Sequence, residues 1–149
     1  VCYNGSMNKV TGIVIAVIVI IAVYFFFFNK DTAIKVPLPL EGSNSIVVTS
    51  PIKDAQISSP LVIAGRARGT WFFEGSFPVF LVDADRNIIA EGHVTAQGEW
   101  MTQDFVKFVG SLQFNNYIKG QKGSLILKKD NPSGLPENDE AIRIPIMFK

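Results

Sequence analysis

Residues 77–96 read FPVFLVDADRNIIAEGHVTA, two apolar segments joined by the polar run DADRN at residues 83–87. Asp and Asn favour turns because their side chains bond to nearby backbone groups. The second segment alternates with the period of two that is typical of a strand. Inward positions are expected at Ile88, Ala90, Gly92, Val94 and Ala96, and outward positions at Ile89, Glu91, His93 and Thr95. The stretch therefore predicts a β-hairpin.

Similar short apolar segments, separated by turn residues, continue on both sides of this hairpin. Seven strands are expected, at residues 45–50, 57–67, 77–83, 87–96, 104–115, 124–128 and 141–148. No window among them has a convincing helical stripe of apolar residues. The soluble part of the chain is therefore predicted to be all-β, with seven strands in a two-sheet sandwich.

Two further strands show a clear alternation. Val106, Phe108, Gly110, Leu112 and Phe114 should share one face, and Ile142, Ile144, Ile146 and Phe148 another. Pro145 interrupts the last strand and has no N–H group to donate, so an edge strand or a break in pairing is expected there.

An uncharged run of 19 residues, Val10 to Phe28, lies near the N-terminus and reads VTGIVIAVIVIIAVYFFFF. As a helix it would be about 28 Å long, close to the hydrocarbon thickness of a bilayer. A buried strand and a cleaved signal peptide are the alternatives, but the run is too long for the first and lacks a small-residue cleavage site for the second. We therefore predict an uncleaved signal anchor, with a cytoplasmic stub at residues 1–9, a transmembrane helix at 10–28, an extended linker at 29–44 and the domain at 45–149.

Charge and cysteine content limit the possible functions. From Asp31 onward the chain has 12 Lys and Arg against 13 Asp and Glu, a balance that does not favour nucleic-acid binding. The single cysteine, Cys2, precedes the apolar run, so the domain contains no disulfide. No glycine-rich phosphate loop or HExxH motif is present, and no cofactor is expected.

Several blocks of the sequence resemble a known family. They are Ser50-Pro51, Ser59-Pro60 with Gly65, Gly69 to Glu74, Gly92-His93, Trp100 and Asp130 to Gly134. In this order they resemble the immunoglobulin-like domain of bacterial spore-germination proteins that is associated with the germination protein GerM, over about Ile46 to Phe148. The resemblance implies an immunoglobulin-like sandwich in a bacterial envelope protein, displayed outside the cytoplasm and without an established catalytic activity.

An aromatic cluster is the main candidate for a binding site. Trp71, Phe72, Phe73 and Phe77 surround Glu74, and Trp100 follows a turn that could close the same end of the domain. Aromatic rings provide large contact areas at low entropic cost, so the cluster could be a ligand platform. The alternative is that the rings plug the open end of the sandwich and Glu74 pairs with Arg66 or Arg68.

Two other features of the sequence contain residue types that occur in metal or catalytic sites. Asp130, Asn131 and Asp139 lie in one acidic loop and offer oxygen ligands for calcium, although their spacing is not that of an EF-hand and a solvated structural loop is the alternative. His93, the single histidine, is expected on an outward strand face without the partners of a catalytic triad.

Together these features predict a non-catalytic binding or scaffolding module, held in the cell membrane by one span, whose domain contacts cell-wall polymer or envelope proteins. The alternatives are an accessory subunit of a membrane complex and a self-assembling, adhesin-like surface protein.

Overall fold

The computed structural model describes residues 43–115 and 117–149. The stub, the apolar run at 10–28 and nearly all of the predicted linker lie outside these residues. Within the described part, no helix has the length and hydropathy needed to cross a membrane.

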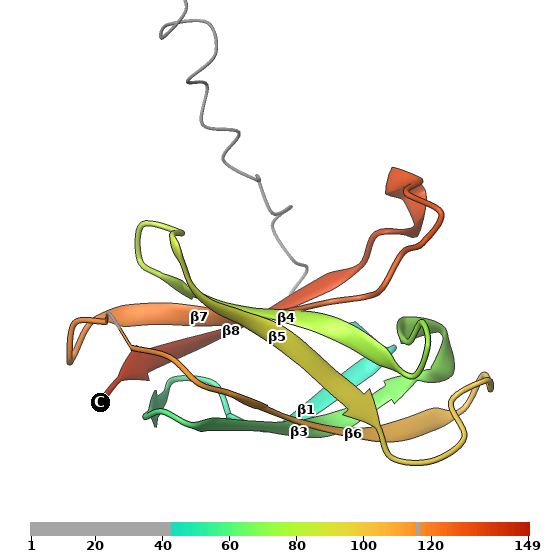
Figure 1. Ribbon diagram of the computed structural model, residues 1–149, viewed down its shortest axis with the longest axis horizontal. Coiled ribbons are helices and arrows are strands. Elements are labelled where there is room, and N and C mark those ends of the chain that lie inside the picture. Colours follow the sequence, from blue (N-terminus) through green and yellow to red (C-terminus); the bar gives the residue numbers. More distant parts are fainter. Residues whose placement is uncertain (1–42, 116) are drawn as a thin grey trace, which may run out of the picture. The chain divides into compact units, whose positions relative to one another are not determined.

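The described residues form eight strands and two single-turn 3₁₀ helices (Figure 1). The strands are β1 (Ile46–Ser50), β2 (Ala55–Ile57), β3 (Leu61–Arg68), β4 (Ser76–Asp83), β5 (Ile88–Ala96), β6 (Phe105–Leu112), β7 (Lys122–Lys128) and β8 (Ala141–Phe148). The 3₁₀ helices are η1 (Gly69–Trp71) and η2 (Pro136–Asn138). The all-β prediction is therefore confirmed.

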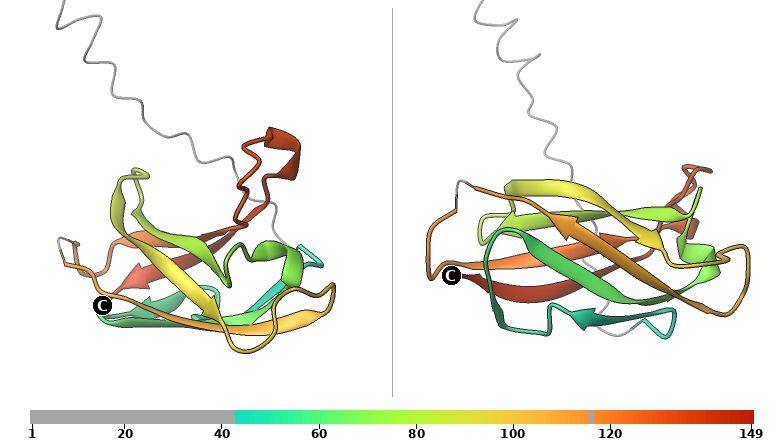
Figure 2. Two further views of the ribbon diagram at one scale, coloured as in Figure 1. Left: turned by 45° about the vertical axis from the view of Figure 1, so that its right-hand side comes forward. Right: turned by 60° about the horizontal axis from the view of Figure 1, so that its bottom comes forward.

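The strands make one continuous, curled sheet in the order β1-β3-β6-β5-β4-β7-β8-β2. Only two residue pairs, Thr95 with Val109 and Ala96 with Phe108, join β5 to β6. The sheet folds over at this short junction, so that β1, β3 and β6 lie opposite β4, β5, β7 and β8 (Figures 1 and 2). The two predicted layers are thus halves of one sheet.

The predicted count of seven strands is wrong, because the strand expected to begin at Ile57 begins at Leu61, and Ile57 instead ends a separate short strand, β2. Pro60 has no N–H group to continue a ladder, and Ser59 accepts a hydrogen bond from the Phe114 N–H through its Oγ at 2.9 Å. Residues 55–57 form β2, which pairs in parallel with residues 146–148 of β8. Parallel pairing with a strand about 90 residues away leaves no local sequence signal.

Pro145 lies immediately before the residues of β8 that pair with β2. Its carbonyl oxygen accepts a hydrogen bond from the Asp54 N–H at 2.8 Å, while Pro145 itself pairs with Ser124 of β7. The N–H and C=O of one strand residue point to the same side, so the missing N–H faces the β2 side and leaves the β7 ladder intact. The last strand was expected to be an edge strand or to have a break in pairing at Pro145. It is not an edge strand, because β8 lies between β7 and β2, and β2 forms the edge of the sheet.

The predicted alternation holds in β6 and fails in part of β5. Val106, Phe108 and Leu112 are buried, as expected. Ile88, which was expected to point inward, is 44% exposed. The register shifts between the pairs Leu81–Ala90 and Val82–Ile88, so Ile89 is the extra residue of a β-bulge and packs against the core instead.

The predicted loop at 83–87 is confirmed and is held by one carboxylate. Asp83 accepts hydrogen bonds from the backbone N–H of Asn87 at 2.8 Å and from its Nδ2 at 2.9 Å. Burial raises the pKa of the Asp83 carboxyl, but the hydrogen bonds from Asn87 and from the backbone of Asp85 and Arg86 outweigh it and hold the pKa below its ordinary value of 3.8.

Replacing Asp83 with Asn is expected to lower the melting temperature at pH 7, since a depressed carboxyl pKa contributes stability above the unfolded-state value. The contribution is lost as the pH falls below 3.8 through the folded-state pKa, so both proteins should then melt together. Thermal unfolding from neutral to acid pH measures this difference. A difference that persists unchanged in acid would contradict the assigned role of the carboxylate.

Candidate functional site

A two-residue hairpin projects where the chain passes from η1 into β4. The N–H of Phe73 donates to the Ser76 carbonyl at 3.0 Å, and the N–H of Ser76 donates to the Phe73 carbonyl at 3.1 Å. Glu74 and Gly75, between them, have φ values of 51° and 77°. Positive φ at both central residues matches the type I′ turn of tight hairpins.

Three of the four candidate aromatic residues lie in the core below the hairpin. Trp71 and Phe77 are fully buried and Phe72 is nearly so. The Phe77 ring centre lies 5.4 Å from that of Trp71 and 5.2 Å from that of Phe72. These three side chains therefore close this end of the domain, as the plug alternative expected, and do not form the ligand platform.

The polar atom of Trp71 is satisfied inside the domain. Its Nε1 donates to the Ser45 Oγ at 2.9 Å, and the Ser45 hydroxyl in turn donates to the Glu140 carboxylate. This chain of bonds ties η1 to the residues that precede β1 and β8. It fixes the base of the hairpin.

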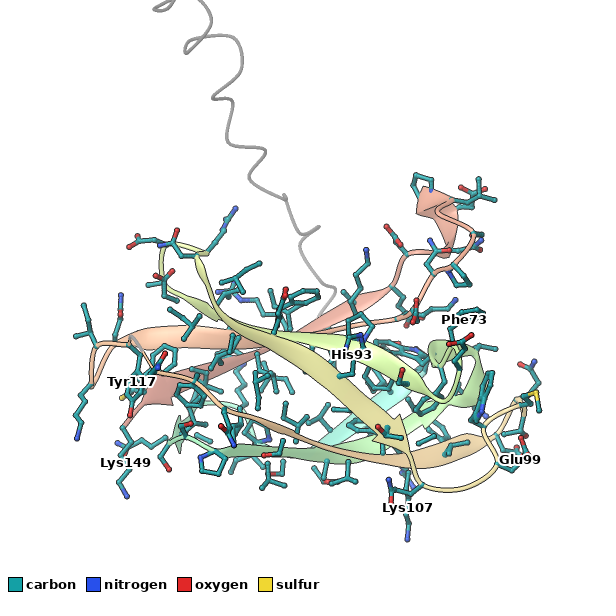
Figure 3. The ribbon with its side chains drawn as sticks, viewed as in Figure 1. Phe73, His93, Glu99, Lys107, Tyr117 and Lys149 are labelled. Atoms are coloured by element: carbon teal, nitrogen blue, oxygen red, sulfur yellow. The ribbon has the colours of Figure 1, made fainter. Side chains whose placement is uncertain are left out.

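Phe73 and Glu74 are exposed at the turn of the hairpin. Phe73 is 43% exposed, and Figure 3 places it at the end of the domain opposite Tyr117. Arg66 and Arg68, the expected partners of Glu74, instead lie over the ring of Phe105. Among residues 43–115 and 117–149 the Glu74 carboxylate has no ion pair or hydrogen bond, so it is free to meet a ligand.

The loop that carries Trp100 is attached firmly to the same end. Gly69 lies so close to it that a Cβ atom would come within 2.3 Å of the Trp100 carbonyl oxygen and 2.0 Å of that of Thr102. The Gly69 N–H also donates to the Asp104 carbonyl at 3.1 Å. The indole of Trp100 lies against Gly75, where a Cβ would be 3.4 Å from Nε1.

Trp100 is partly buried and packs against the core, while its neighbour Met101 is 74% exposed. We define the hairpin tip as Phe73, Glu74, Trp100 and Met101. Sequence reasoning missed Met101, although its position next to Trp100 in a turn was the available signal.

The acidic loop is organised by its own hydrogen bonds. Asn131 donates from Nδ2 to Asp139 Oδ1 at 2.9 Å and to the Leu135 carbonyl at 2.8 Å. Lys128 Nζ lies 3.6 Å from the same Asp139 oxygen. The hydrogen bond from Asn131 and the Lys128 charge lower the pKa of Asp139.

Two of the proposed calcium ligands, Asn131 and Asp139, are therefore bonded to each other, and Asp139 also faces Lys128. In the described part of the chain, no three His, Cys, Asp or Glu side chains are grouped so that they could hold a metal ion. Asp130 joins the loop to η1 through its backbone, donating to the Trp71 carbonyl at 3.1 Å.

His93 lies exposed on β5, opposite Pro78 of β4 (Figure 3). The imidazole forms no hydrogen bond with any residue that the structure describes. Its outward orientation is as predicted.

A model of the family described as the immunoglobulin-like domain of bacterial spore germination matches residues 45–134. The chain belongs to this family. No curated protein and no solved structure gives a significant match. The match to the spore-germination domain includes every strand from β1 to β7 and ends inside the β7–β8 loop, whereas the sequence resemblance was expected to reach Phe148.

Truncating Phe77 and Phe73 in turn should distinguish a core residue from an exposed residue of the hairpin tip by the loss of stability. Phe77→Ala is expected to lower the free energy of unfolding by about 3–5 kcal/mol, because a fully buried ring leaves a cavity. Phe73→Ala should cost under about 1 kcal/mol, since this ring is largely in contact with solvent. Urea unfolding of both variants measures the contrast, and equal losses would contradict the division into core and tip.

The backbone of Glu74 gives a second test. Asn adopts positive φ more readily than Glu, so Glu74→Asn is expected to leave stability unchanged or to raise it by up to about 1 kcal/mol. Glu74→Val should lower stability, because a β-branched side chain is strained in this conformation. The melting temperatures of the two variants check the expected order. A loss of stability in Glu74→Asn would mean that the carboxylate supports the fold.

Proposed function

We propose that this chain is a non-catalytic binding module of the bacterial cell envelope that is anchored by its N-terminal apolar run and contacts its partner through the hairpin tip. The observation that carries the proposal is the exposed ring of Phe73 on a turn whose base is held by buried aromatic residues. Family membership supports an immunoglobulin-like domain as the scaffold.

The tip is pre-organised for binding. Two backbone hydrogen bonds fix the turn, and the bond from Trp71 to Ser45 fixes its base. A rigid aromatic side chain loses little entropy when it meets a partner, so more of the contact energy remains as affinity. An unpaired carboxylate next to the ring adds a hydrogen-bond acceptor that gives the contact direction.

This combination suits the saccharide chains of a cell-wall polymer. The exposed ring of Phe73 offers a flat apolar surface for the C–H face of a sugar, and Glu74 can accept hydrogen bonds from its hydroxyl groups. In this proposal the domain stands outside the cytoplasm.

The test is binding of the full-length chain, in detergent, to purified peptidoglycan and to an envelope extract. Phe73→Ala is expected to weaken binding by roughly tenfold or more, since a central aromatic contact is worth about 1.4 kcal/mol or more. Glu74→Asn removes the carboxylate while keeping the turn, and it should weaken binding as well.

Ile118→Ala is the matched control, because Ile118 is exposed and is adjacent to Tyr117, at the opposite end of the domain (Figure 3). It should bind as the unaltered chain does. Equal binding by Phe73→Ala, Glu74→Asn and the control would exclude the hairpin tip as the contact surface.

A further inference from the structure

The outward face of β1, β3 and β6 carries a second surface, separate from the hairpin tip. Arg66, Arg68 and Lys107 point from this face, and Figure 3 shows Lys107 directed away from the opposite layer. We call it the cationic face. The side chains of the cationic face are not part of the sheet core, and they make none of the contacts described above for the hairpin tip.

The three charges of the cationic face are crowded together. Arg66 and Lys107 are direct cross-strand partners, an arrangement in which like charges destabilise a sheet. The guanidinium carbons of Arg66 and Arg68 lie 5.3 Å and 4.4 Å from the centre of the same Phe105 ring. The two arginines are thus within about 10 Å of each other, where salt screens their repulsion only in part.

No acidic residue of the described chain forms an ion pair with these cations. The outward positions of the three strands carry no carboxylate. Arg68 is held from below by a hydrogen bond from Nη1 to the Gln103 carbonyl at 3.1 Å. Yet the residues from 43 to 149 contain equal numbers of acidic and basic side chains, eleven of each. This face therefore carries a local excess of positive charge.

A shallow hollow of about 470 Å³ lies beside the charges. The small side chain of Ala64 leaves its floor low, Val47 and Val109 are half-exposed at its sides, and Arg66 and Lys107 stand at its rim. The hollow is too open to enclose a small ligand, of which a pocket usually buries most of the surface. Its concave shape does not fit the flat surface of a bilayer.

The chemistry of the rim favours a phosphate group. A phosphate group can accept hydrogen bonds from an arginine and a lysine on two neighbouring strands at once, and the guanidinium fork matches its oxygens. Apolar side chains along the hollow suit the uncharged links between successive phosphates.

We propose that the cationic face binds an extended anionic polymer through its phosphodiester groups. The polymer lies along the hollow, and its phosphates neutralise Arg66, Arg68 and Lys107. This contact does not require the hairpin tip.

The experiment measures binding of a synthetic oligo(glycerol phosphate) to the full-length chain in uncharged detergent, at several salt concentrations. Three cations, each contributing about 0.7 to the logarithmic salt dependence, predict a roughly 15- to 20-fold loss of affinity between about 50 and 200 mM salt. In Arg66→Gln/Lys107→Gln the affinity should be lower, and the same salt change should reduce it less than about threefold. Its melting temperature should not fall, because the variant removes a like-charge pair.

Lys119→Gln/Lys122→Gln removes two exposed lysines outside β1, β3 and β6, and it should bind with unchanged affinity and salt dependence. Phe73→Ala should bind the oligomer with the affinity of the unaltered chain. Failure of the cationic-face proposal can therefore be distinguished from failure of the proposed function, which depends on the hairpin tip. Arg66→Lys/Arg68→Lys keeps the charge but loses the forks, and it should weaken binding while retaining the salt dependence.

Three results would overturn the proposal. One is unchanged binding by Arg66→Gln/Lys107→Gln. Another is equal or tighter binding of poly-L-glutamate, which would indicate an acidic protein partner. The third is binding to vesicles that contain phosphatidylglycerol without binding to the oligomer, which would indicate a membrane surface.

Discussion

Contact between Phe77 and Phe108 is the interaction on which the rest of the structure depends. Phe77 lies on β4 and Phe108 on β6, in opposite halves of the curled sheet, and their ring centres are 5.1 Å apart. Only two residue pairs join β5 to β6, so backbone hydrogen bonding alone does not hold the halves together. Burial of these large rings supplies that cohesion through the removal of apolar surface from water.

The same packing determines how the surface can be used. Trp71 and Phe72 complete the aromatic cluster around Phe77, and the chain must then turn sharply to begin β4. The type I′ hairpin makes that turn and leaves Phe73 exposed between the buried rings of Phe72 and Phe77 in the sequence. Core and display surface are therefore produced by one short segment.

Outside the core, the two candidate surfaces differ in kind. At the hairpin tip a rigid ring and a free carboxylate are exposed on a turn. The cationic face is a sheet surface with a shallow hollow, where cross-strand pairing brings Arg66 and Lys107 together. One surface arises from local turn geometry and the other from the pairing of distant strands.

Much of the fold could be predicted from local patterns. The alternation in β6, the outward position of His93 and the loop that Asp83 caps all follow from neighbouring residues. The β-bulge at Ile89 was not predicted, because a single extra residue is only recognised from the register with β4. For the same reason β2 was not predicted, since its three residues form a strand only by pairing with β8.

The sequence by itself determined the all-β class, the family and the presence of an aromatic segment between two strands. Periodicity and composition carry this information because they depend on residues close in the chain. Only the tertiary structure decided which of Trp71, Phe72, Phe73 and Phe77 meet solvent, and that Arg66 and Arg68 lie over Phe105 rather than beside Glu74. Burial and ion pairing depend on which side chains of distant segments come into contact, and the strand register determines which side chains these are.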